Sequence, residues 1–300
     1  MQAIASKPLA APPDRATRFA SKLSWGHLIL FVGAAYLLAW LCFSAPILAA
    51  RGLIALPAPE AAFLTMATLG VCLAGIAATA AESGQRGVRA LVVQVLRWRV
   101  RPAWYVTAIF VPALFPAGGF LLSLALGTPP PPAPPLQVWL SLPLLLIALV
   151  IPAILEEVGW RGYALPRLQH SFGALRASLI LGVIWAGLHL PLWLLPDFGF
   201  ADQSIALYLA QVLAFSVVLA WLYNATGGSL LLTGIAHAAI NGWPTPWGAA
   251  LQSLPVEVGA APISEFHVLI TAATVAFAVV VVIATRGLTS STWPQLQPRL

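Results

Sequence analysis

Residues 138–163 read VWLSLPLLLIALVIPAILEEVGWRGY, an apolar run that ends in two adjacent carboxylates, Glu156 and Glu157, and an arginine, Arg161. A helix needs about 20 mostly apolar residues to cross the hydrocarbon core of a bilayer. The stretch therefore predicts a membrane-spanning helix with ionisable residues near one end. An ionised carboxylate in the membrane costs on the order of 2.5–3.5 kcal/mol even on mild insertion scales, so each must be neutralised, paired or hydrated.

The composition of the whole chain extends this prediction. Of its 300 residues, 60% are hydrophobic and 8% are charged, and the mean hydropathy is +0.90. So few polar groups cannot cover a water-soluble globule. We predict an all-α polytopic membrane bundle of about eight transmembrane helices. The expected spans lie near 28–49, 62–81, 104–126, 138–164, 177–195, 204–224, 229–250 and 266–285.

The basic residues predict the orientation, because Lys and Arg near span ends stay preferentially on the cytoplasmic side. With the N-terminus inside, 14 of the 15 basic residues fall on that side and only Arg51 falls outside. We expect an integral protein of the cell membrane, with cytoplasmic tails at 1–27 and 286–300 and a bundle at 28–285. Since topology explains the net charge of +6, the charge calls for no nucleic-acid partner.

Two segments depart from the simple pattern of spans. In the seventh expected span, Pro244 and Pro246 should break the helix just after Asn241. The segment 86–104 mixes arginines with Val, Leu and Trp. It either lies along an anionic membrane surface or serves only as a positive-inside anchor.

Helix geometry predicts different surroundings for the two carboxylates. Glu157 and Arg161 are four residues apart and share a face, so we expect an ion pair between them. Glu156 lies about 100° round the helix from Glu157 and has no obvious partner in its own span. We therefore expect its partner to come from another span.

Two histidines in later spans are candidate partners. Counted from the cytoplasmic side, His189 and His237 lie roughly 18 Å and 12 Å along their helices, and Glu156 lies at roughly 12 Å. Three ionisable side chains from three spans are thus expected at one level of the bundle. Asn241 follows His237 by one turn, as His189 follows Trp185. Each residue also has a structural explanation: a histidine bonded to a backbone carbonyl, an interhelical amide or a packed indole.

These residues lie in three motifs that resemble those of the CAAX protease and bacteriocin-processing family, the type II CAAX prenyl endopeptidase-like intramembrane endopeptidases. EEVGWRGY at 156–163, followed by PRLQ, is similar to the motif EExxxR. WAGLH at 185–189 resembles FxxxH, with Trp in place of Phe, and HAAIN at 237–241 resembles HxxxN. The resemblance covers roughly residues 86–250, which would form the catalytic core.

The resemblance implies an intramembrane endopeptidase that cleaves a peptide bond with water activated by Glu156 and His189. His237 and Asn241 would stabilise the oxyanion. The supporting residues would be Glu157, Arg161 and Trp185. The expected partners are the lipid bilayer and a membrane-associated peptide or protein substrate, either prenylated or of the leader type.

Three alternatives follow from the same residues. Glu156, His189 and His237 would also suit zinc, although the HExxH pattern is absent and we favour a mechanism without a cofactor. A proton-coupled transporter also carries Glu and His in the membrane, but the sequence has no evident internal repeat. A catalytically inactive family member would act as a membrane scaffold or immunity protein.

Overall fold

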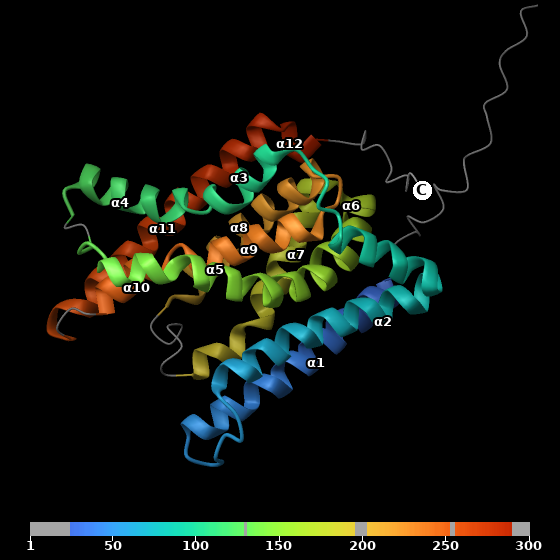
Figure 1. The fold of residues 1–300 in the computed structure, drawn as a ribbon, viewed down its shortest axis with the longest axis horizontal. Coiled ribbons are helices and arrows are strands. Elements are labelled where there is room, and N and C mark those ends of the chain that lie inside the picture. The colour runs from blue at the N-terminus through green and yellow to red at the C-terminus, as the bar shows by residue number, and fades with distance from the viewer. Residues whose placement is uncertain (1–24, 129–130, 196–202, 253–255, 290–300) are drawn as a thin grey trace, which may run out of the picture.

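The computed structural model describes residues 25–128, 131–195, 203–252 and 256–289, and within these ranges every regular element is a helix (Figure 1). The elements, in chain order, are α1 (Trp25–Ala50), α2 (Glu60–Val95), α3 (Pro102–Phe110), α4 (Leu114–Leu126), α5 (Leu136–Glu157), the π-helix η2 (Val158–Ala164), α6 (Leu165–Phe172), α7 (Ala174–Leu188), the 3₁₀-helix η3 (Leu190–Leu194), α8 (Ile205–Ala225), α9 (Leu230–Gly242), α10 (Thr245–Gln252), α11 (Val256–Ala284) and α12 (Arg286–Thr289). The predicted all-α class is confirmed.

The described helices account for most of the predicted spans. Six are long and apolar enough to cross a membrane: Trp25–Ala50, Glu60–Val95, Leu136–Phe172, Ala174–Leu194, Ile205–Ala225 and Glu265–Ala284. A seventh span is possible if α3 and α4, bent by 47° at their junction, cross together. The protein is therefore a polytopic membrane bundle.

The seventh predicted span, 229–250, is two short helices in the structure. Helix α9 has 13 residues and α10 has 8, so α9 is roughly 20 Å long, shorter than the hydrocarbon core. The break lies between Gly242 and Thr245, where the chain contains Pro244. Proline lacks the backbone N–H that a helix interior needs, which is why the interruption was predictable. Most side chains of α9 are nevertheless buried among the other helices.

The helices pack as neighbouring pairs. Helix α1 packs on α2, α5 on α9, α7 on α8, and α11 on both α4 and α8. In Figure 1, α9 and α5 lie near the middle of the molecule, with α1 and α2 along one side. The segment that carries the two adjacent carboxylates is therefore enclosed by helices that are distant in sequence.

Two glycines allow the backbones around this segment to come close. A Cβ atom at Gly159 in η2 would lie 2.7 Å from the carbonyl oxygen of Val71 in α2. A Cβ atom at Gly234 in α9 would lie 3.1 Å from the Cα atom of Ile154 in α5. Small residues permit such close contacts between membrane helices. The close contacts at Gly159 and Gly234 hold α2 and α9 against the end of α5.

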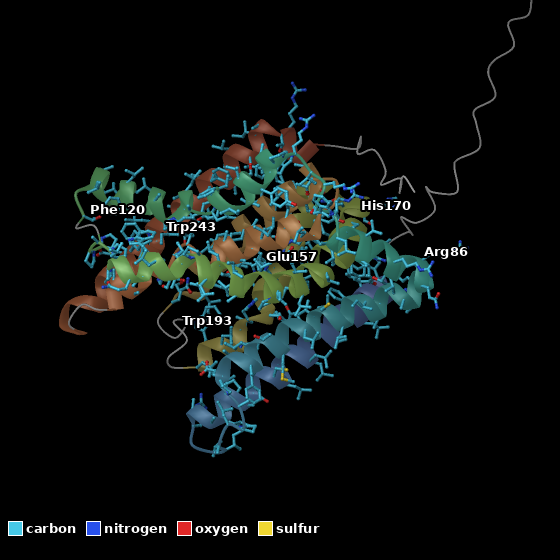
Figure 2. The ribbon with its side chains drawn as sticks, in the orientation of Figure 1. Arg86, Phe120, Glu157, His170, Trp193 and Trp243 are labelled. Carbon is cyan, nitrogen blue, oxygen red and sulfur yellow. The ribbon has the colours of Figure 1, made fainter. Side chains whose placement is uncertain are left out.

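An ionic cluster joins α2, shortly before its interruption at Gly84, to η2 and α6. Glu82 of α2 accepts hydrogen bonds from Arg167 Nε at 2.8 Å and from the Tyr163 hydroxyl at 2.8 Å. The loops that the charge pattern assigns to the cytoplasm therefore meet at one end of the bundle, and Figure 2 shows Arg86 and His170 at that end. Which side of the membrane this end faces stays a prediction.

Candidate functional site

The two adjacent carboxylates lie where α5 passes into the π-helix η2. Glu157 is fully buried and Glu156 is 8% exposed. All seven residues of η2 are buried, among them Trp160 and Arg161. π-Helical turns are rare and occur frequently at functional sites, where their wider turn changes the direction of side chains. The local backbone thus marks the same segment as the sequence motif.

Glu157 binds two cationic or potentially cationic side chains with one oxygen. Its Oε1 lies 2.9 Å from Arg161 Nη1 and 2.9 Å from His237 Nδ1. The predicted ion pair between Glu157 and Arg161 is confirmed. The contact with His237 was not predicted, and it comes from α9 packing on α5. A carboxylate only accepts hydrogen bonds, so His237 donates through Nδ1.

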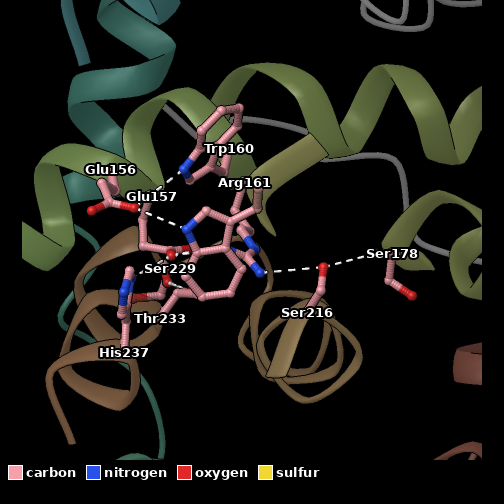
Figure 3. A network of polar contacts seen from close by, with 10 residues as sticks. Glu156, Glu157, Trp160, Arg161, Ser178, Ser216, Ser229, Thr233 and His237 are labelled. Atoms are coloured by element: carbon pink, nitrogen blue, oxygen red, sulfur yellow. Dashed lines mark hydrogen bonds and ion pairs between the residues drawn. The ribbon is translucent and has the colours of Figure 1, made fainter. Parts of the chain in front are cut away.

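Arg161 is fully buried and held on three sides (Figure 3). Besides its bond to Glu157, Nη2 donates to the Ser216 hydroxyl at 3.4 Å, and that hydroxyl donates to the carbonyl of Ser178 at 2.7 Å. Its guanidinium carbon also lies 4.7 Å from the centre of the Trp185 ring. A cation over an indole face is attracted by the ring quadrupole, more strongly where water is excluded.

Glu156 is bound by two indole groups. Its Oε2 accepts hydrogen bonds from Trp160 Nε1 at 3.3 Å and from Trp185 Nε1 at 3.0 Å. The expectation that Glu156 lacks a partner in its own span is therefore wrong, because Trp160 is four residues further on. A partner from another span exists as expected, but it is Trp185 and not the candidate histidines, whose Nδ1 atoms bind the Trp185 carbonyl and Glu157. Both donors stabilise an ionised carboxylate, since an N–H group that donates to a charged oxygen forms a strong hydrogen bond.

His189 follows the last residue of α7 and faces back along that helix. Its Nδ1 lies 3.0 Å from the carbonyl oxygen of Trp185. Its ring also lies near Tyr208 of α8, with 6.3 Å between ring centres. Since a carbonyl only accepts hydrogen bonds, Nδ1 carries the proton and the lone pair of the neutral ring lies on Nε2. In this form of the ring, Nε2 can accept a proton.

Trp185 joins the three ionisable side chains that were expected at one level of the bundle. Its indole N–H binds Glu156, its carbonyl binds His189, and its ring lies 5.0 Å from that of His237. The prediction treated Trp185 as a supporting residue and missed Trp160 and Ser216 altogether. Trp160 was detectable, because it stands at i+4 from Glu156 within the same motif. No sequence signal points to Ser216, which meets Arg161 through tertiary packing.

Asn241 differs from the other predicted site residues. It lies one helical turn beyond His237 in α9, but it is exposed. Within the described part of the chain, its side chain forms no hydrogen bond, and only its carbonyl accepts one, from Thr245 Oγ1 at 3.4 Å. The structure therefore does not bring Asn241 into the polar network.

The charges of the buried cluster do not balance. Glu156 and Glu157 carry two negative charges when ionised, and Arg161 supplies one positive charge. Among the described residues, Glu157 Oε2 and Arg161 Nε are buried atoms that have no hydrogen-bond partner. Buried charges and unsatisfied polar atoms are costly. A proton on His237 would neutralise the cluster, and a bound water would satisfy Glu157 Oε2.

The same residues do not form a metal site in this arrangement. Across the described ranges, no three His, Cys, Asp or Glu side chains are grouped so that they could hold a metal ion. The predicted zinc alternative used Glu156, His189 and His237, and these three side chains form no such group. The contact with Glu157 uses only Nδ1 of His237 and leaves Nε2 available. A chelator experiment decides whether activity needs a metal.

Comparisons with known proteins identify the relatives of this segment. Residues 138–243 match the family model described as "Type II CAAX prenyl endopeptidase Rce1-like". A protein named CAAX prenyl protease 2 from Methanococcus maripaludis is 30% identical over 102 residues, which cover 32% of this chain and 38% of that relative. The chain thus matches less than half the length of that relative. Every candidate site residue described above, from Glu156 to Asn241, lies inside the matched family segment.

Proposed function

We propose that the protein is an intramembrane endopeptidase in which Glu156 and His189 activate water, and the proposal starts from the similarity of residues 138–243 to the Rce1-like family model of type II CAAX prenyl endopeptidases. The observation that carries the proposal is the position of Trp185, whose indole N–H binds Glu156 while its carbonyl binds His189. One residue thus contacts both the carboxylate and the imidazole, through its indole nitrogen and its backbone carbonyl.

The proposed base consists of two groups, Glu156 and His189, each of which keeps one acceptor atom for water. Glu156 Oε2 is occupied by the two indoles, and Oε1 accepts no hydrogen bond from any described residue. His189 keeps its Nδ1 proton on the carbonyl of Trp185, which leaves the Nε2 lone pair. We assign the attacking water to a position between Glu156 Oε1 and His189 Nε2. There it loses a proton as it attacks the peptide carbonyl carbon.

The proposed oxyanion donor is His237. Its Nδ1–H group is bound to Glu157, so Nε2 donates a hydrogen bond only when the ring is cationic. Such a cation balances the charge left by two carboxylates and one guanidinium. Nε2–H of the cationic ring would then stabilise the negative oxygen of the tetrahedral intermediate. Asn241, exposed one turn further along α9, is assigned the second contact once substrate is bound.

The reaction ends with cleavage of the carbon–nitrogen bond. The proton taken from water passes to the departing amine, and the carbonyl carbon keeps the hydroxyl group as a new carboxyl terminus. Glu157 and Arg161 take no part in the proton transfers. They position His237 and Trp185 through the contacts described above.

The proposal is tested by cleavage of a membrane-peptide library by the purified protein in lipid nanodiscs. The library contains prenylated and unprenylated versions of each peptide, because the name of the M. maripaludis relative refers to prenyl substrates. We expect the wild type to cleave and Glu156→Gln to lose at least about 100-fold in kcat, the scale of a general base. A parallel reaction with chelator tests for a required metal.

The matched control is Glu265→Gln, which removes the carboxylate of an exposed residue on α11. It should cleave like the wild type. Retained cleavage by well-folded Glu156→Gln would contradict the assigned base. If the folded wild type cleaves no peptide while liposomes show substrate-coupled flux, the protein is a carrier and the endopeptidase proposal fails.

A further inference from the structure

The loop between α2 and α3 presents an exposed set of basic and apolar side chains. Trp98 is 59% exposed and Leu96 is 66% exposed, and Arg99 and Arg101 are also exposed. We call residues 96–101 the arginine loop. Helix α2 turns back at Gly84, whose φ of 58° and ψ of −154° interrupt the helix. Figure 2 shows Arg86 at the outer end of the molecule, near this turn.

The arginine loop is well anchored, although Leu96, Trp98, Arg99 and Arg101 are exposed. The hydroxyl of Tyr105 donates to the carbonyl of Trp98 at 2.7 Å, and the hydroxyl of Ser229 donates to the carbonyl of Arg97 at 2.7 Å. Both anchors use backbone oxygens. Neither anchor involves a guanidinium group of the loop.

A surface hollow of about 260 Å³ lies on this loop and is lined by Val93, Leu96, Arg97, Trp98 and Arg99. Arg97 Nε is buried and has no hydrogen-bond partner among the described residues. Arg99 lies over the Trp98 ring, with 5.1 Å between its guanidinium carbon and the ring centre. In the described ranges, no carboxylate forms an ion pair with an arginine of the loop. The two arginines that line the hollow, Arg97 and Arg99, therefore have no carboxylate partner among the described residues.

We propose that the arginine loop binds the phosphate of an anionic phospholipid, with Arg97 and Arg99 as its donors. Arginine is suited to phosphate because its N–H groups form a planar fork. The exposed Trp98 and Leu96 fit the boundary between headgroups and acyl chains, where indole rings gather. A free phosphate ion would use the arginines but would leave these two apolar side chains in water. The combination of two arginines with two exposed apolar side chains therefore fits a phospholipid better than a free phosphate ion.

Binding at this position would act on the helix that carries His237. The Ser229 hydroxyl that bonds to the Arg97 carbonyl also accepts the backbone N–H of Leu232 at 3.2 Å, and so caps the start of α9. His237 lies further along the same helix. A lipid held by the arginine loop therefore stabilises the start of α9. This inference concerns lipid binding and does not depend on the proposed peptidase activity.

The test is native mass spectrometry of the detergent-solubilised full chain titrated with phosphatidylglycerol, phosphatidylcholine or inorganic phosphate. We expect phosphatidylglycerol to bind at least about tenfold more tightly than phosphatidylcholine. Arg97→Gln combined with Arg99→Gln should raise its Kd by roughly 30-fold, if each arginine contributes as a basic residue near an anionic surface does. The same lipid should raise the unfolding temperature of the wild type but not of the double variant.

Arg51→Gln is the matched control, because Arg51 is an exposed arginine in the turn after α1, outside the arginine loop. It should keep the wild-type lipid preference, and Arg97→Lys should bind with intermediate affinity. An unchanged preference in the double variant would overturn the inference. So would inorganic phosphate that displaces phosphatidylglycerol at equal concentration, since the site would then recognise phosphate alone.

Discussion

At the scale of single residues, Trp185 connects the parts of the candidate site. Its indole nitrogen, its ring face and its carbonyl oxygen serve different neighbours: Glu156, Arg161 and His189. The family motif FxxxH, which WAGLH resembles, has Phe at this position. Phe would keep an aromatic ring and the backbone carbonyl but would lose the indole N–H donor. The role of the indole N–H group can therefore be tested separately from the packing of the ring.

We expect Trp185→Phe to fold and to lower kcat by roughly tenfold, because Glu156 loses a hydrogen bond to its charged oxygen and keeps only Trp160. The measurement is steady-state cleavage of the best library peptide in nanodiscs. Trp193→Phe serves as the control, since Trp193 donates to the carbonyl of Gln203 outside the carboxylate cluster. An unchanged kcat in Trp185→Phe would show that this bond has no effect on catalysis.

The buried ion pair should show strong coupling in a double-mutant cycle. Arg161→Met leaves Glu157 buried without its cation, which should cost about 3–5 kcal/mol of unfolding free energy. Adding Glu157→Gln removes the uncompensated charge, so the double variant should recover part of that loss. Unfolding in lipid bicelles gives the four free energies. Additive effects would contradict the direct pairing of the two side chains.

At the scale of elements, the contact between α5 and α9 determines which carboxylate meets His237. The two helices approach at Gly234, where an added Cβ atom would meet the Ile154 backbone at 3.1 Å. His237 follows Gly234 by three residues and so lies on the same side of α9. A change in the separation of the helices should therefore change the bond between Glu157 and His237.

Gly234→Val should separate α9 from α5, destabilise the fold by about 1–3 kcal/mol and reduce cleavage further than the lost stability explains. The measurements are unfolding free energy and kcat at a temperature where the variant is folded. Gly33→Ala is the control, because a Cβ atom there would have no neighbour within 4 Å. Normal activity in folded Gly234→Val would show that the spacing is not critical.

At the scale of the whole molecule, the open question is how the bundle is oriented in the membrane. Arg167 binds Glu82 of α2, and Figure 2 shows Arg86 and His170 at the same end of the molecule. The positive-inside rule predicts that this end faces the cytoplasm. The same rule places Arg51 on the opposite side. We propose this orientation, with both tails inside, for the cell membrane.

The orientation is tested with single cysteines in a background where Cys42 and Cys72 are replaced by alanine. An impermeant maleimide should label Arg51→Cys in intact cells, and it should label Arg86→Cys only after the membrane is opened. Both residues are exposed in the structure, so the reagent can reach either one. The reverse labelling pattern would invert the proposed topology.

The amino-acid sequence by itself determined that the protein lies in a membrane, that its fold is all-α, and which residues pair within one helix. Apolar runs of span length require helices in a bilayer. Glu157 and Arg161 are four residues apart, so an α-helical geometry brings them together. Pro244 marks the end of α9 for an equally local reason. The three motifs also predicted the family of the segment, and the comparison with the family model agrees.

Only the tertiary structure decided which groups meet across helices. His237 binds Glu157, although the sequence argument assigned it to the level of Glu156. The indole of Trp185 reaches Glu156, and Asn241 stays exposed. The physical reason is that depth along a helix follows from counting residues, whereas rotation and spacing between helices depend on close contacts such as those at Gly159 and Gly234. Those contacts join residues that are far apart in the chain, and no local periodicity records them.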